Sequence, residues 1–130
     1  MRALILDSEG VSKLIARDRG LNEWLSAARA EDTPVIASAV TLVEAVAPKS
    51  DVRAADYALS RIRVVNATAA HAKVATGLLR KAGLHGHRYA LDALVAATAL
   101  AAGGGVVLTS DPDDLAALLD GQPAVRVVKI

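Results

Sequence analysis

The chain of 130 residues contains no cysteine and almost no aromatic residues. Without cysteine, disulfides, zinc–thiolate sites and thiol catalysis are excluded. Aromatic side chains make up 2% of the chain, and there is no phenylalanine. The few that are present are Trp24, Tyr57 and Tyr89. A binding surface that stacks nucleic-acid bases on aromatic rings is therefore poorly supported.

An excess of one charge is also lacking, because the formal net charge is +1. This balance excludes neither a nucleic acid nor a protein partner, but it removes the simple argument from a strongly basic chain. The apolar run before Asp7 is too short for the core of a signal peptide. Residues 90–108 are apolar, yet they contain Asp92 and three glycines, so they do not fit a membrane span. We expect a soluble cytoplasmic protein.

Hydrophobic residues make up 53% of the chain, enough for the core of one domain covering residues 1–130. Short apolar runs predict strands at 3–6, 34–37, 62–65, 106–108 and 125–128. Longer segments of helical period predict helices at 11–16, 21–30, 38–46, 51–60, 69–82, 88–102 and 112–119, with Pro48 ending the third helix and a loop at 83–87. This alternation predicts an α/β fold, a single domain with a mainly parallel five-stranded sheet flanked by helices.

Four acidic residues are placed to meet at one edge of such a sheet. Ligand sites of parallel sheets form beyond the carboxyl ends of the strands. Asp7 directly follows the first strand, and Asp111 closely follows the fourth. Glu44 lies on the helix after the second strand. Asp92 lies near the start of the helix that runs back to feed the fourth strand, so it reaches the same edge.

Each acid also has a purely structural explanation. Asp7 and Asp111 are each placed to cap the helix that follows them. Asp92 lies four residues after Arg88, the spacing of an ion pair on a helix. Glu44 could face solvent at a helix edge. These explanations account for each acid separately. They do not explain why all four acids would lie at one edge of the sheet.

A cluster of carboxylates has a definite chemical consequence. The charges repel one another and raise each other's pKa, and a divalent cation relieves the repulsion. A ligand set made only of oxygen atoms suits Mg²⁺ or Mn²⁺. Such an ion activates water and stabilises charge at a phosphoryl centre. Metal-dependent hydrolysis of a phosphodiester follows as the working hypothesis.

Four segments of the chain resemble the four sequence blocks of the PIN domain family. They are LILDS at 4–8, LVEA at 42–45, LDALVAATAL at 91–100 and LTSDPDDL at 108–115. The third and fourth blocks together are fairly specific, whereas the first alone is weak. A stand-alone domain of this size is similar to the toxin of a bacterial VapBC toxin–antitoxin pair.

The resemblance implies an activity and a set of partners. The activity is Mg²⁺- or Mn²⁺-dependent endoribonuclease cleavage of structured RNA. The partners are a second copy of the chain in a homodimer and an inhibiting VapB-type antitoxin. A surface around Val11, Leu14 and Ile15 is a weak internal indication of the dimer, because so small a monomer is not expected to bury it fully.

The resemblance also assigns roles to residues. It implies a catalytic set of Asp7, Glu44, Asp92 and Asp111. Within this set, the metal contacts fall on Asp7, Asp92 and Asp111. Supporting positions are Ser8, Thr109 and Asp114. Glu9 departs from the family pattern, and we expect a solvated turn residue there rather than a further acid of the pocket.

A basic stretch beside the Asp92 helix has two interpretations of equal weight. Its residues Arg80, Lys81, His87 and Arg88 either contact RNA phosphates or form a solvated helix end. Two alternatives to a nuclease stay open. One is a degenerate PIN-like module that binds RNA or protein without catalysis. The other, less favoured, is a phosphatase with an aspartyl nucleophile, for which Asp7-Ser8-Glu9 is a poor match.

Overall fold

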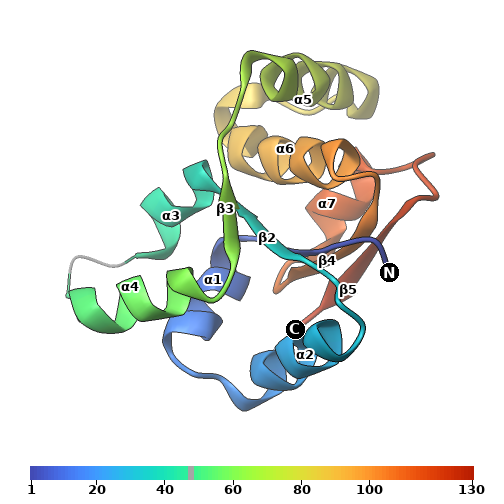
Figure 1. Ribbon diagram of the computed structural model, residues 1–130. Helices are drawn as coiled ribbons and strands as arrows, with labels where there is room; N and C mark the ends of the chain where they lie inside the picture. Colours follow the sequence, from blue (N-terminus) through green and yellow to red (C-terminus); the bar gives the residue numbers. More distant parts are fainter. Residues whose placement is uncertain (47–48) are drawn as a thin grey trace.

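Five parallel strands form the centre of the fold in the computed structural model, which describes residues 1–46 and 49–130 (Figure 1). They are β1 (Leu4–Leu6), β2 (Val35–Ser38), β3 (Arg63–Val65), β4 (Gly105–Thr109) and β5 (Val125–Lys129). Their order in the sheet is β3-β2-β1-β4-β5. Each of the four strand pairings is parallel. The predicted α/β architecture is confirmed, and the sheet is more regular than "mainly parallel".

Helices cover both faces of the sheet (Figure 1). They are α1 (Ser8–Ile15), α2 (Arg19–Ala30), α3 (Ala39–Ala45), α4 (Val52–Ser60), α5 (Ala69–Ala82), α6 (Gly86–Ala101) and α7 (Pro112–Leu118). Because side chains alternate along a strand, Leu4 and Leu6 pack with α1 and α2, whereas Ile5 packs with α6 and α7. Two apolar clusters, one on each face of the sheet, together form the core of the domain.

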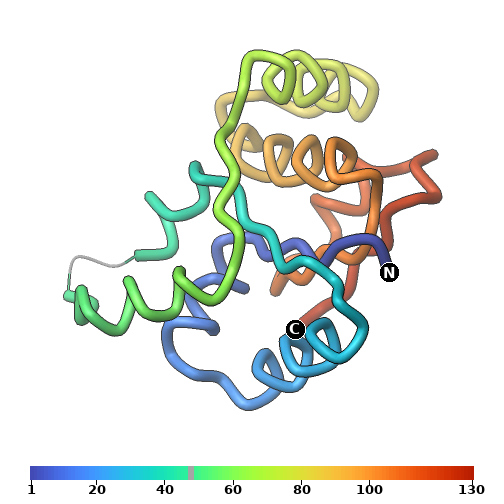
Figure 2. The backbone as a smooth tube through the Cα atoms, in the orientation of Figure 1, coloured from blue at the N-terminus to red at the C-terminus, as the bar shows by residue number. Residues whose placement is uncertain are grey.

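The strand order changes direction between β1 and β4. The chain moves outward from β1 to β2 and β3, then crosses back through α5 and α6 to place β4 on the other side of β1 (Figure 2). Such a change of direction opens a crevice at the carboxyl ends of the two central strands. The fold therefore places the ends of β1 and β4 where a ligand site is expected.

The first helix begins earlier than the sequence predicted. α1 starts at Ser8 rather than at residue 11, because the Asp7 side chain caps it. α2 likewise starts at Arg19 rather than at residue 21, with Asp18 accepting a hydrogen bond from the Leu21 N–H at 3.0 Å. In both cases the capping carboxylate stabilises a polar first turn that hydrophobic periodicity does not reveal.

The helix that carries Asp92 also starts before its predicted first residue. α6 begins at Gly86, inside the predicted loop, and Tyr89 breaks the helical backbone with φ −113° and ψ 15°. At its other end, the glycines of residues 103–105 stop the helix as predicted. A Cβ on Gly105 would lie 2.1 Å from the Ala3 carbonyl oxygen, so β4 enters the sheet at a position that only glycine fits.

The predicted apolar dimer surface is wrong for its two main residues. Val11 and Leu14 are 0% and 1% exposed, because both pack beneath the sheet. Exposed apolar side chains occur instead at Val43 and Val52, which are 87% and 70% exposed. The predicted helix end at Pro48 lies outside the described residues. Within the described residues, the helices are too short or too polar to cross a membrane.

Candidate active site

Asp7 lies at the carboxyl end of β1, in the crevice beside β4. Its backbone N–H donates to the Leu108 carbonyl at 3.3 Å, which holds it against β4. The residue is only 7% exposed. Its Oδ1 accepts a hydrogen bond from the Gly10 N–H at 2.8 Å. The carboxylate is thus a helix cap, as one interpretation of the sequence held, and it is also buried at the end of β1. Its role in a metal site stays a prediction.

Burial raises the pKa of the Asp7 carboxyl above its ordinary value. Hydrogen bonds from the Thr109 side chain and the Gly10 N–H oppose this rise. The charge on Glu9 adds to it, although Glu9 itself is exposed in the first turn of α1. The expected solvated position of Glu9 is correct, and its charge is still felt at Asp7.

Thr109 joins Asp7 to Asp111. It is the last residue of β4 and is 1% exposed. Its Oγ1 accepts a hydrogen bond from the Asp111 N–H at 3.1 Å, and its side chain hydrogen-bonds to Asp7. Asp111 occupies the N-cap position of α7, but its exposed side chain makes no capping hydrogen bond within the described part of the chain. The Asp111 carboxylate therefore remains available to a ligand.

Asp92 faces the same group of acids from α6. Its pKa is raised to about 6, first by burial and then by the charges on four other carboxylates. These are, in order of effect, Asp114, Asp7, Glu44 and Asp111. Asp92 therefore lies close enough to Asp7, Glu44 and Asp111 for their charges to oppose its ionisation. The alternative partner, Arg88, has its guanidinium 5.3 Å from the centre of the Tyr89 ring.

Glu44 approaches the acidic group from α3, which packs against α1. It is exposed on the last turn of that helix. Its Oε1 accepts a hydrogen bond from the Ser8 hydroxyl at 2.9 Å. Glu44 is therefore solvent-facing, as one interpretation of the sequence held, and is also directed toward the start of α1.

The residues fit a divalent cation by chemistry but not as a preformed cage. The donors are carboxylate and hydroxyl oxygens, which suit Mg²⁺ or Mn²⁺. Over residues 1–46 and 49–130, however, no group of three or more acidic or histidine side chains is arranged to hold a metal ion. Asp7 and Glu44 each have one oxygen engaged by the protein. Binding of an ion would require these side chains to rearrange.

The four basic residues of the predicted RNA contact are all exposed: Arg80, Lys81, His87 and Arg88. The Lys81 ammonium nitrogen lies 3.2 Å from where a Cβ on Gly121 would be, in the segment between α7 and β5. Contact of this stretch with RNA stays a prediction.

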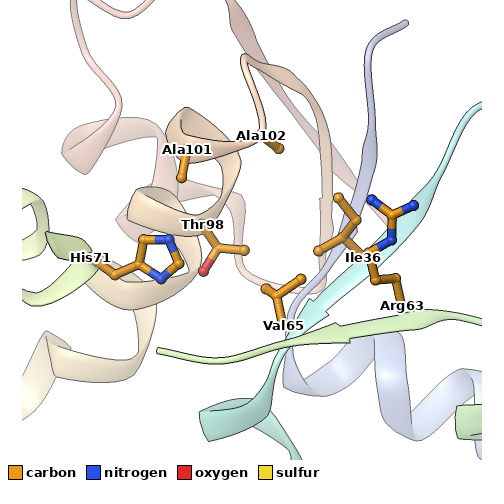
Figure 3. A pocket seen from close by; sticks show the side chains of 7 residues that line it. All are labelled: Ile36, Arg63, Val65, His71, Thr98, Ala101 and Ala102. Atoms are coloured by element: carbon orange, nitrogen blue, oxygen red, sulfur yellow. The ribbon is translucent and has the colours of Figure 1, made fainter. Parts of the chain in front are cut away.

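A separate hollow of about 220 Å³ lies between the edge strand β3 and the end of α6 (Figure 3). It is mainly apolar, with Arg63 and His71 as its basic residues. His71 is otherwise engaged in capping α5, because its Nδ1 accepts from the Thr68 N–H at 3.4 Å. The lining of the hollow includes none of the acidic residues, so it is not part of the candidate active site.

Sequence reasoning missed Gly10 as a residue of the site. It donates the N–H that fixes Asp7, and an added Cβ would lie 3.1 Å from the Leu6 Cβ. A small residue therefore lets α1 start close against β1. The available signal was its spacing three residues after an aspartate, which is the spacing of a side-chain N-cap bond.

The chain belongs to the PIN domain family, whose pattern it matches over residues 4–118. The matched range contains the four acids and extends from β1 through α7. Among curated protein sequences, none matches the chain significantly.

Solved structures with the same fold include a toxin–antitoxin complex from Klebsiella pneumoniae, at 20% identity and a TM-score of 0.68, covering 98% of this chain and 100% of that one. VapBC2 of Rickettsia felis, bound to a fragment of promoter DNA, has 18% identity and a TM-score of 0.73, with 98% of each chain covered. DNA-bound VapBC of Salmonella typhimurium has 18% identity and a TM-score of 0.69, covering 99% of this chain and 98% of that one. FitAcB of Neisseria gonorrhoeae has 23% identity and a TM-score of 0.67, with 95% of each covered. At these identities the likeness establishes the fold alone.

Proposed function

We propose that this protein is a Mg²⁺- or Mn²⁺-dependent endoribonuclease and the toxin of a type II toxin–antitoxin pair. The single observation that carries the catalytic part is the pKa of Asp92, raised by burial and by four neighbouring carboxylates. Such repulsion is unfavourable for the isolated fold. Perturbed pKa values cluster at functional sites, and a bound cation would relieve the repulsion. Membership of the PIN domain family supports a nuclease in particular.

The roles of the acids follow from their positions. Asp7, Asp92 and Asp111 would hold the cation, and Glu44 would complete the negative rim. When bound, the cation would supply an activated water and stabilise charge on the phosphate. Thr109 orients Asp7 and the backbone of Asp111 through its hydrogen bonds. Attack of water on phosphorus breaks one P–O bond, and the proton of the water ends on the leaving oxygen or in solvent.

The proposed partners are drawn from the shared fold. The fold is shared with proteins described as VapBC and FitAB complexes, which supports a VapB-type antitoxin as inhibitor. A homodimer and a cytoplasmic location belong to the same proposal. The apolar side chains of Val43 and Val52 are exposed, and Val43 directly precedes Glu44 in α3.

The test is cleavage of RNA by the purified protein. We expect fragments from total RNA in Mn²⁺ or Mg²⁺ and none in EDTA, and loss of cleavage in Asp92→Asn. Cleavage that persists in EDTA would contradict the metal requirement. Binding of RNA without cleavage, in either metal, would favour the non-catalytic PIN-like module instead.

A further inference from the structure

We propose that Ser8 is a positioning residue, which sets the direction of the Glu44 carboxylate at the rim of the acidic site. The effect of Ser8 on metal binding rests on the proposed function. The hydrogen bond between Ser8 and Glu44 does not depend on it. The Ser8 hydroxyl donates to Glu44 Oε1 at 2.9 Å, across 36 positions of sequence. Ser8 thus acts through Glu44 rather than on the substrate.

Packing alone does not fix the Glu44 side chain. The residue is exposed on the last turn of a helix only seven residues long. Its neighbour Val43 is 87% exposed, whereas Ala45 is the buried residue that holds the end of α3 to the core. A glutamate in this position has three free torsions, and ordering it opposes a sizeable conformational entropy. One charge-assisted hydrogen bond is therefore enough to select a direction.

Ser8 is well placed to make that selection because α1 is itself fixed. It is the first residue of α1, directly after the N-cap residue Asp7, and Val11 and Leu14 anchor the helix in the core. The position of the hydroxyl is therefore tied to Asp7 by one residue of rigid backbone. Because the bond uses Oε1, the other oxygen of Glu44 is left for a ligand. The bond couples the direction of Glu44 to the position of Asp7.

The chain contains a matched control for this bond. Ser12, one helical turn further along α1, also links α1 to α3, but its hydroxyl donates to the Ala45 carbonyl at 3.2 Å. Removing the Ser12 hydroxyl therefore weakens the docking of α3 without touching a carboxylate. A difference between the two serine variants isolates the effect on the Glu44 side chain.

The experiment compares Ser8→Ala, Ser8→Thr and Ser12→Ala in the full chain. In metal-free protein, NMR relaxation of the Glu44 side-chain methylenes should show a lower order parameter in Ser8→Ala. The order parameter should be close to the wild-type value in Ser8→Thr and in Ser12→Ala. An unchanged order parameter in Ser8→Ala, or an equal fall in Ser12→Ala, overturns the proposal.

Titration with Mn²⁺ gives the functional readout. We expect Ser8→Ala to weaken Mn²⁺ binding about 3- to 10-fold, the size of one lost hydrogen bond that orients a ligand. In a Glu44→Ala background, the same substitution should change the affinity less than about twofold, because its target is gone. If Ser8→Ala weakens Mn²⁺ binding just as much in the Glu44→Ala background, Ser8 acts directly on the ion, and the proposal is overturned. If wild-type protein binds no Mn²⁺, the proposed function fails, while the NMR comparison still decides the role of Ser8.

Discussion

The Asp7 carboxylate caps the helix that begins one residue after it, because its Oδ1 accepts a hydrogen bond from the Gly10 N–H at 2.8 Å. The same carboxylate lies at the carboxyl end of β1, in the crevice beside β4. A structural role and a proposed catalytic role therefore rest on one side chain. Substitutions at Asp7 need to be chosen so that the two roles are separated.

Asp7→Asn and Asp7→Ala should differ in stability but not in activity. Asparagine caps a helix about as well as aspartate, whereas alanine at this position lowers the free energy of unfolding by about 1 kcal/mol. We expect both variants to lose RNA cleavage, because each removes the negative charge. Urea unfolding should place Asp7→Ala about 1 kcal/mol below Asp7→Asn. Wild-type cleavage rates in Asp7→Asn would remove Asp7 from the site.

Asp92→Asn should stabilise the protein in a pH-dependent way. The pKa of Asp92 in the folded protein is about 6, above the ordinary value of 3.8. The folded state therefore resists ionisation, and its stability falls as the pH rises from about 4 through 6. The asparagine variant escapes this fall. Allowing for solvent screening of a half-buried group, we expect a gain of about 1 kcal/mol at pH 7.5.

The gain from Asp92→Asn should be largely lost at pH 4, where the aspartate is protonated in the folded chain and partly protonated in the unfolded chain. Thermal unfolding of both proteins at pH 4.0 and pH 7.5, in EDTA, makes the comparison. A difference in melting temperature of the same size at both pH values would mean that the effect is one of packing. The electrostatic description of the acidic group would then be incorrect.

Thr109→Val should damage both stability and cleavage. Valine keeps the shape of the side chain but leaves the Asp111 N–H without its acceptor and removes the hydrogen bond to Asp7. We expect a loss of about 1–3 kcal/mol in urea unfolding and at least a tenfold slower cleavage. Thr109→Ser retains the hydroxyl, so it should keep most of the activity. Equal activities in the two variants would show that the hydroxyl has no part in the site.

A divalent cation should stabilise the wild-type protein but not a variant that lacks two of the proposed ligand carboxylates. A ligand that binds only the folded state adds about 2.7 kcal/mol to the free energy of unfolding when its concentration is 100 times its dissociation constant. We therefore expect Mn²⁺ to raise the melting temperature of the wild type by several degrees. The Asp7→Asn/Asp92→Asn double variant should show little change. An equal rise in both proteins would indicate binding elsewhere.

The sequence was most informative where one residue acts with its immediate neighbours. Asp7 and Asp111 could be assigned to one sheet edge because they directly follow buried apolar runs, and parallel strands end at a common edge. The sequence also identified Asp92 correctly as an acid within an apolar helix. Asp114, a supporting residue in the sequence, proves to exert the largest charge effect on Asp92.

Features that depend on tertiary contacts could not be read in advance. The bond between Ser8 and Glu44 spans 36 positions, and no local pattern encodes it. The burial of Val11 and Leu14 was misjudged because so small a monomer was not expected to bury this face of the helix fully. Both side chains instead join Leu4 and Leu6 in the apolar cluster on one face of the sheet.

The most direct test of the account is the cleavage of total RNA by wild-type protein and by Asp92→Asn, each in Mn²⁺ and in EDTA. We predict fragments only from the wild-type protein in Mn²⁺. Circular dichroism should show that both proteins are folded at the assay temperature. Equal cleavage by Asp92→Asn, or wild-type cleavage that is unaffected by EDTA, would contradict a metal-dependent nuclease built on these carboxylates.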